Sequence, residues 1–525
     1  MKYIILPILI GISLCISRAV VHDPAIIQVE GTYYIFGSHL AVAKSEDLIN
    51  WKQISHTDYE NPNTNPVFGN IRETFKESFK WAGYDDGDTA GGKYAVWAPD
   101  PFYNPDYIWA DGNKGAFMLY YATSSTWRRS CIGFLISKRV DGDYIYGDTI
   151  IYSGFSNTGG VYYDGDKSKR DTTWSNDYLH IKKLMDNGII DNNLKTWKCF
   201  AKDGTWEAAY APNAIDQTIF YDSDKNKLYM VYGSWSGGLF VLELGKATGK
   251  PIYPGKDGTD SISKNYVDRY FGIHIAGGNH MSGEGGYIRF DKSSGYYIFY
   301  ETYGWLAATG GYNMRLFRSK NPQGPYVDPA GNQAQYNSAD GDKYGVKLIG
   351  NYQFKNQPGY RSAGHNSALI TDDGKYFLIY HQRFLDEAKG ESFEVRVHEQ
   401  FLNEDKWLVT AVYEYKNEKI KKYVAQEVIG SYEFINHGNV ARDGAMLKTT
   451  RISLDKDGIV SGDEKGTWDM FDGNDYTFVT LTISNVKCKG VFYRQADDNG
   501  EEKMTFTAFG NNNLAIWGSS NVKFL

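Results

Sequence analysis

The chain has 525 residues, with 56 lysines and arginines against 63 aspartates and glutamates and a formal net charge of −7. A mildly acidic chain without a basic block does not suit a nucleic acid or an anionic membrane surface, so both are excluded as partners. Aromatic residues make up 16% of the chain and glycine occurs 56 times, which is typical of an all-β protein with many turns.

The N-terminus predicts an exported protein. Lys2 precedes an apolar run over residues 4–16, and small residues follow at Ser17 and Ala19. This pattern indicates a secretory signal peptide over residues 1–19, and the run is too short for a membrane-spanning helix. The alternative is a lipoprotein signal, in which Cys15 carries a lipid anchor. We therefore expect the chain to be secreted, or held at the cell surface or in the periplasm.

Five copies of one unit follow between residues 20 and 420. Each copy has a short strand associated with a polar residue, then a turn rich in Asp, Asn or Gly, then an aromatic strand, as in residues 211–243. The aromatic strands are centred near Tyr34, Leu119, Tyr229, Tyr297 and Phe377. Five sheet units at irregular spacing predict the blades of a five-bladed β-propeller with long loops between strands.

The polar residue recurs at a nearly constant place in the unit. In four copies it stands 11 to 13 residues before the aromatic strand, at Asp23, Asp216, Glu284 and His365. In the second copy Asp100 stands 19 residues before that strand, and we interpret it as structural. Because the first strand of each blade lines the axis of a propeller, we expect these polar residues to meet in one central pocket.

A second, smaller domain is predicted at the C-terminus. Residues 416–423 are charged and interrupt the aromatic rhythm, which indicates a linker. Residues 426–525 contain short strands with alternating apolar residues, such as TFVTLTI at 477–483. They predict a compact β-sandwich or small β-barrel without evident chemistry of its own.

Five short motifs carry a resemblance to a known family. They are HDPAII at 22–27, WAPD at 97–100, NAID at 213–216, GEGGYI at 283–288 and GHN at 364–366. In this order they resemble family 43 glycoside hydrolases, five-bladed propellers that act on arabinan and xylan. The set looks most like the longer two-domain endo-α-1,5-L-arabinanases and covers about residues 20–415.

The resemblance implies roles for the residues of the pocket. Asp23 is expected to be the general base that activates water, Glu284 the general acid, and Asp216 the residue that orients Glu284 and tunes its pKa. The family inverts the anomeric configuration. His365 matches a histidine that helps to hold a calcium-type ion at the propeller axis, mostly through water.

The expected partner is arabinan or its oligosaccharides, and we expect a monomer. Trp97, Trp235 and Arg383 are the candidate substrate-binding residues. The indole of Trp97 suits the C–H face of a furanose, although a core position is the alternative for this side chain. Two other activities stay open, those of an exo-acting α-L-arabinofuranosidase and a β-xylosidase. A non-catalytic carbohydrate-binding propeller is the alternative of another class, and the presence of all three carboxylates argues against it.

Overall fold

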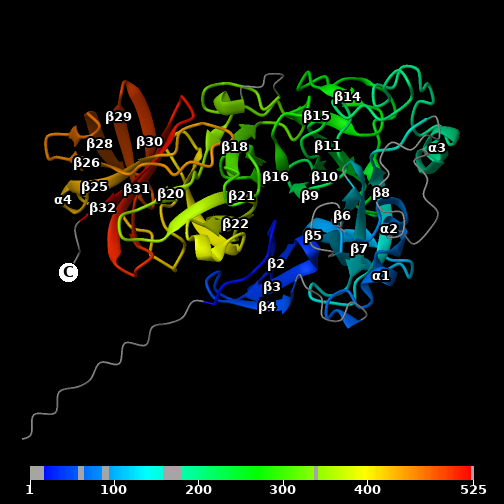
Figure 1. Cartoon of the computed structure of the whole chain (residues 1–525), viewed down its shortest axis with the longest axis horizontal. Coiled ribbons are helices and arrows are strands. Elements are labelled where there is room, and N and C mark those ends of the chain that lie inside the picture. Colours follow the sequence, from blue (N-terminus) through cyan, green and yellow to red (C-terminus); the bar gives the residue numbers. More distant parts are fainter. Residues whose placement is uncertain are drawn as a thin grey trace, which may run out of the picture.

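The computed structural model describes residues 17–56, 64–85, 94–126, 128–157, 179–335 and 341–521. The predicted leader lies outside these residues, apart from Ser17, Arg18 and Ala19. Figure 1 shows the sheets of the first four hundred residues arranged around a centre, with the last hundred residues as a separate body at one end. Within the described ranges no helix has the length and apolar character needed to cross a membrane.

Five antiparallel sheets follow one another along the chain. The first contains β1 (Ala25–Val29), β2 (Thr32–Gly37), β3 (Ala41–Ser45) and β4 (Trp51–Ser55). The second contains β5 (Val96–Ile108), β6 (Lys114–Thr126), β7 (Arg129–Ser137) and β8 (Ile145–Tyr152). The third contains β9 (Thr218–Asp222), β10 (Lys227–Tyr232), β11 (Leu239–Leu244), β12 (Pro251–Ile252), β13 (Gly258–Thr259), β14 (Tyr266–Asp268) and β15 (Gly272–Ala276).

The fourth sheet contains β16 (Glu284–Asp291), β17 (Tyr296–Tyr303), β18 (Asn313–Ser319) and β19 (Val346–Lys347). The fifth contains β20 (Tyr352–Gln353), β21 (Gly359–Ile370), β22 (Tyr376–Phe384), β23 (Glu394–Leu402) and β24 (Leu408–Thr410). The helices are short: α1 (Ile71–Thr74), α2 (Lys76–Ala82), α3 (Leu179–Asp186) and α4 (Ala425–Val428).

The inner strands of the five sheets form a closed ring. β1 contacts β5, β5 contacts β9, β9 contacts β16, β16 contacts β21, and β21 contacts β1. The middle strands are buried almost throughout, as in β17, where only the first of eight residues is partly exposed. Such burial follows because each sheet packs face to face between two neighbours. The predicted five-bladed β-propeller is confirmed.

The first and fifth blades close the ring with residues from the start of the described chain. Ala19 and Val21 are fully buried in a cluster with Val395 and Val397 of β23. The Ala19 carbonyl accepts a hydrogen bond from Val395 N at 3.0 Å, and Arg18 forms an ion pair with Glu414. Part of the segment assigned to the leader is therefore packed into the propeller.

The C-terminal body is a closed barrel, which decides between the two predicted architectures. Its strands are β25 (Gly430–Asn436), β26 (Thr450–Leu454), β27 (Ile459–Gly462), β28 (Gly466–Asp472), β29 (Thr477–Ile483), β30 (Val486–Ala496), β31 (Glu502–Gly510) and β32 (Ala515–Ser520). β25 pairs with both β26 and β32, so no edge is left open. β29 alternates strictly between buried and half-buried residues, as expected for a barrel wall.

The barrel packs on the fifth blade through a shared apolar core. Trp517, Tyr493 and Phe509 of the barrel belong to the same buried cluster as Tyr352 and Trp407 of the blade. The hydroxyl of Tyr493 also donates to a carboxylate of β23, Glu399, at 2.7 Å. Because this buried core is continuous, it holds the barrel in a fixed position on the propeller, whereas a loosely tethered domain would move independently.

Candidate active site

The polar residues predicted for the axis lie where the inner strands begin or bend. Asp23 and Asp216 stand just before β1 and β9, Glu284 is the first residue of β16, and His365 lies inside β21. Asp23, Asp216 and His365 adopt left-handed backbone, with φ of 53°, 57° and 48°. This conformation costs a non-glycine residue on the order of 1 kcal/mol. Such strain persists where the surrounding structure enforces it, and it is concentrated at functional sites.

Asp23 is a buried carboxylate surrounded by hydrogen-bond donors. Its Oδ1 lies 2.8 Å from His22 Nδ1 and 3.2 Å from His365 Nδ1, and Oδ2 accepts a bond from the Ser38 hydroxyl. Burial alone would raise the pKa of Asp23, but the neighbouring imidazoles outweigh it and hold the pKa well below its ordinary value. Asp23 is therefore ionised over the whole ordinary pH range.

Asp216 has the opposite electrostatic character. Burial, followed by the negative charges of Glu284 and Asp23, raises the pKa of Asp216 well above its ordinary value. Hydrogen bonds from the Gly285 N–H and the Ser234 hydroxyl offset only part of this effect. An ionised carboxylate and a carboxyl group that favours its proton thus interact at the propeller axis.

Glu284 is the most accessible of the three carboxyl groups, since it is half-buried whereas the two aspartates are buried. Its Oε2 accepts hydrogen bonds from Trp235 Nε1 at 2.8 Å and from Ser234 Oγ at 3.2 Å. Its Oε1 accepts a bond from the Tyr312 hydroxyl. The carboxyl group is therefore held from three sides, as a group that transfers a proton to a bound substrate requires.

Tyr312 connects the two ends of the site. Its hydroxyl lies 3.5 Å from His365 Nδ1, the same nitrogen that contacts Asp23. A Cβ at Gly364 would lie 2.1 Å from the Tyr312 ring, so only glycine leaves room for the ring. Asp23, His365, Tyr312 and Glu284 form one connected series of contacts.

The sequence did not single out Tyr312, His22, His381 or Ser38. Tyrosine occurs 42 times, so one more tyrosine between two strands carries no signal. His22 could have been found, because it directly precedes the predicted base. His381 lies on β22, and only the tertiary fold brings it to Asp23, whose N–H donates to His381 Nδ1 at 3.3 Å.

Three of these side chains can hold a metal ion. One ligand atom each of His22, Asp23 and His381 lies within 4.8 Å of the others. Nε2 of His381 is buried and has no protein partner among the described residues. Two imidazoles and one carboxylate are not the all-oxygen shell that calcium prefers, so a calcium ion would meet the imidazoles through its own water. His365, predicted as the metal-holding residue, contacts Asp23 but is not one of this group.

The three predicted substrate-binding residues have different surroundings. Trp97 is half-buried, and its Nε1 donates to Ser124 O at 2.9 Å. Trp235 lies against Glu284, as described above. Arg383 is only 4% exposed, and its Nε donates to the Leu306 carbonyl at 2.6 Å. A sugar contact stays a prediction for all three.

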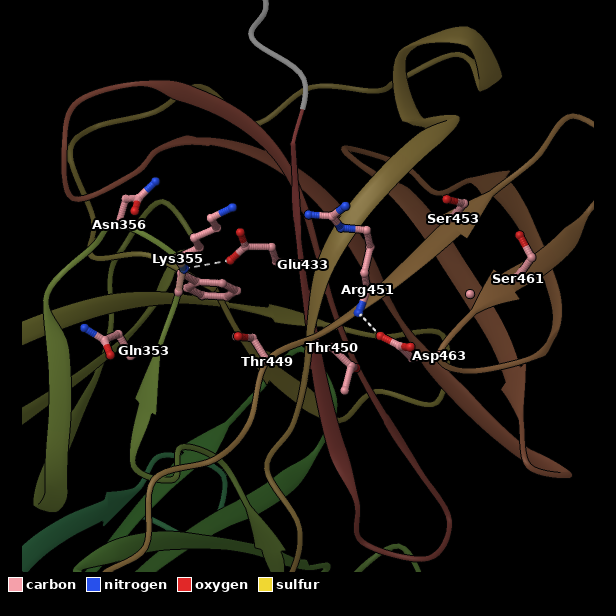
Figure 2. A pocket seen from close by; sticks show the side chains of 12 residues that line it. Gln353, Lys355, Asn356, Glu433, Thr449, Thr450, Arg451, Ser453, Ser461 and Asp463 are labelled. Atoms are coloured by element: carbon pink, nitrogen blue, oxygen red, sulfur yellow. Dashed lines mark hydrogen bonds between the residues drawn. The ribbon is translucent and has the colours of Figure 1, made fainter.

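A cleft lies away from these carboxyl groups, at the seam between the fifth blade and the barrel. This seam cleft has a volume of about 780 Å³ and is lined by Gln353–Asn356 of the blade and by Glu433, Arg451 and Asp463 of the barrel (Figure 2). Asp463 is exposed, and Glu433 and Asp463 accept hydrogen bonds from backbone N–H groups. Asp23, Asp216 and Glu284 do not line this cleft, so the chemistry is not assigned to it.

Two carboxyl groups with opposite protonation preferences in one pocket are what glycoside hydrolysis requires. Residues 181–408 match the family described as "Glycosyl hydrolases family 43", and residues 412–518 match a family of C-terminal lipocalin-like domains. The chain belongs to glycosyl hydrolase family 43.

The similarity to individual proteins extends over nearly the whole chain. An extracellular endo-α-(1→5)-L-arabinanase of Thermotoga petrophila is 35% identical over 95% of this chain and 93% of its own length. A second such enzyme, from Bacillus subtilis, is 35% identical over 95% of this chain and 92% of its own. A crystal structure of a family 43 glycoside hydrolase from Bacillus licheniformis superposes with a TM-score of 0.77 at 35% identity, covering 97% of this chain and all of that one.

Proposed function

We propose that this protein is an extracellular glycosidase that cleaves α-1,5-linked L-arabinofuranosides inside arabinan chains. One observation carries the proposal: an ionised Asp23, a proton-retaining Asp216 and an accessible Glu284 interact with one another at the propeller axis. The substrate class is supported by the two endo-arabinanases that match 95% of the chain at 35% identity.

The mechanism that we propose is a single displacement with inversion. Asp23 accepts a proton from water as the water oxygen bonds to the anomeric carbon. Glu284 donates its proton to the glycosidic oxygen as the bond to that oxygen breaks. Asp216 stays close to Glu284, and its negative charge, when present, favours the protonated form of its neighbour. Tyr312, Trp235 and Ser234 fix the orientation of the acid.

We also propose that a hydrated calcium-type ion binds beside His365 at the axis. Its charge would offset the repulsion among the three carboxyl groups without supplying the nucleophile. Chelation or His365→Ala should then lower activity more than it lowers the melting temperature. Unchanged rates, together with elemental analysis that finds no bound metal, would exclude the ion.

Product analysis on linear α-1,5-arabinan tests the proposed activity. We expect a ladder of oligosaccharides early in digestion, and Asp23→Ala should abolish it because no other group activates the water. Asp143→Ala is the matched control, since Asp143 shares the left-handed backbone (φ 56°) but lies on the surface. Arabinose alone from the first time point would indicate the exo-acting alternative. Activity only on aryl xylosides would indicate a β-xylosidase, and binding without turnover would indicate a carbohydrate-binding propeller.

A further inference from the structure

The connection between β25 and β26 leaves the C-terminal barrel and lies along the fourth blade. Within this loop, residues 437–449, the Asn439 carbonyl accepts a hydrogen bond from Arg315 Nη2 at 2.7 Å. The Ala441 carbonyl accepts one from Asn313 Nδ2 at 3.0 Å, and Ala441 is 5% exposed and packs against β17. Buried bonds of this kind are costly to break, so the loop is held firmly on the propeller.

A second group of contacts fixes the loop just beyond this point. A Cβ at Gly444 would lie 2.1 Å from the Thr309 carbonyl oxygen, and a Cβ at Gly311 would lie 2.6 Å from the backbone of Asp443. The two backbones therefore touch where only glycine permits it. Arg442 lies between the two anchored stretches, so its backbone has little freedom.

The side chain of Arg442 reaches a residue of the active site. Its Cζ lies 4.7 Å from the centroid of the Trp235 ring, which is a cation–π arrangement. Nε1 of the same indole donates to Glu284 Oε2 at 2.8 Å. No carboxylate among the described residues forms an ion pair with Arg442, so no ion pair competes with the indole for the cation. The barrel thus touches the catalytic carboxyl group through one intermediate ring.

We propose that Arg442 is a positioning residue supplied to the active site by the C-terminal barrel. Its guanidinium covers one face of Trp235 and holds the indole N–H on Glu284, so that the acid keeps the orientation needed for proton donation. The inference rests on the proposed role of Glu284 as general acid. It gives the barrel a part in catalysis that its sequence alone did not indicate.

The test is a double-mutant cycle in the full-length protein. Arg442→Ala should lower kcat on linear arabinan about two- to fivefold, the range of a cation–π contact made by an exposed cation. KM and the melting temperature should change little, and Arg442→Lys should recover part of the loss because an ammonium also binds an aromatic face. Trp235→Phe keeps the ring face but removes the N–H donor. In that background Arg442→Ala should cost much less, since there is no indole hydrogen bond left to orient.

Arg451→Ala is the matched control. Arg451 is an exposed arginine of the same barrel on β26, at the seam cleft (Figure 2), and it bonds Asp463 through its backbone N–H. Wild-type kcat for Arg442→Ala, or an equal loss with and without Trp235→Phe, would overturn the inference. Failure of the proposed function is distinguishable, because it would appear as retained arabinan turnover in Glu284→Gln.

Discussion

Removing the hydroxyl of Tyr312 tests whether the connected series across the pocket contributes to catalysis. Tyr312 is 1% exposed, and its hydroxyl donates to Glu284 and lies 3.5 Å from His365 Nδ1. Phenylalanine keeps the ring in the space that Gly364 leaves for it. A hydrogen bond to a charged group contributes about 1.5–3 kcal/mol, so Tyr312→Phe should lower kcat/KM roughly 10- to 150-fold.

The pH profile of kcat/KM is the decisive assay for this variant. Because the Tyr312 hydroxyl bonds directly to the proposed acid, its removal should displace the alkaline limb of this profile. Tyr303→Phe is the control: Tyr303 is fully buried and donates to another buried carboxyl group, Glu301, at 2.9 Å. That variant should lose stability without a shift of the limb. A Tyr312→Phe enzyme with wild-type kcat/KM and an unmoved limb would refute the role given to the hydroxyl.

Two further predictions concern stability. Asp216→Asn should lower turnover, yet it should raise the melting temperature at pH 7 and not at pH 4. Because the pKa of Asp216 is raised in the folded protein, the unfolded chain loses this proton at lower pH, and the folded state loses stability as the pH rises above about 3.9. Asparagine carries no such proton and removes that cost. An equal change at both pH values would contradict the assignment. A chain that starts at Val20 should have a free energy of unfolding at least about 1 kcal/mol lower than a chain that starts at Ser17, because it lacks the Arg18–Glu414 ion pair and the Ala19–Val395 hydrogen bond. Identical denaturation midpoints would show that these contacts do not stabilise the fold.

The residues that recur in register could be predicted from the sequence, because each blade begins at the same place in its repeat. Asp23, Asp216, Glu284 and His365 were found in this way, and the structure brings them to one axis. Alternating apolar residues could not separate a sandwich from a barrel, since both bury every second residue of a strand. The distinction between a sandwich and a barrel depends on the pairing of β25 with β32, which joins the two ends of the domain.

The rest of the site depends on contacts that local sequence does not encode. Tyr312 directly precedes β18, His381 comes from β22, and Arg442 from a loop of another domain. The roles of Trp235 and Arg383 are equally non-local. The indole N–H of Trp235 donates to Glu284, and the guanidinium of Arg383 donates to the backbone at Leu306. A sugar contact of either side chain stays a prediction. Spacing along one strand contains no information about either partner.

The configuration of the first-formed product tests the central claim most directly. Proton NMR during hydrolysis of linear α-1,5-arabinan by the full-length protein should show the β-anomer first, because water activated by Asp23 attacks from the face opposite the bond that Glu284 protonates. Mutarotation should then produce the α-anomer more slowly. Appearance of the α-anomer first, or a glycosyl-enzyme trapped on Asp23, would contradict both the inverting mechanism and the roles of the two carboxyl groups.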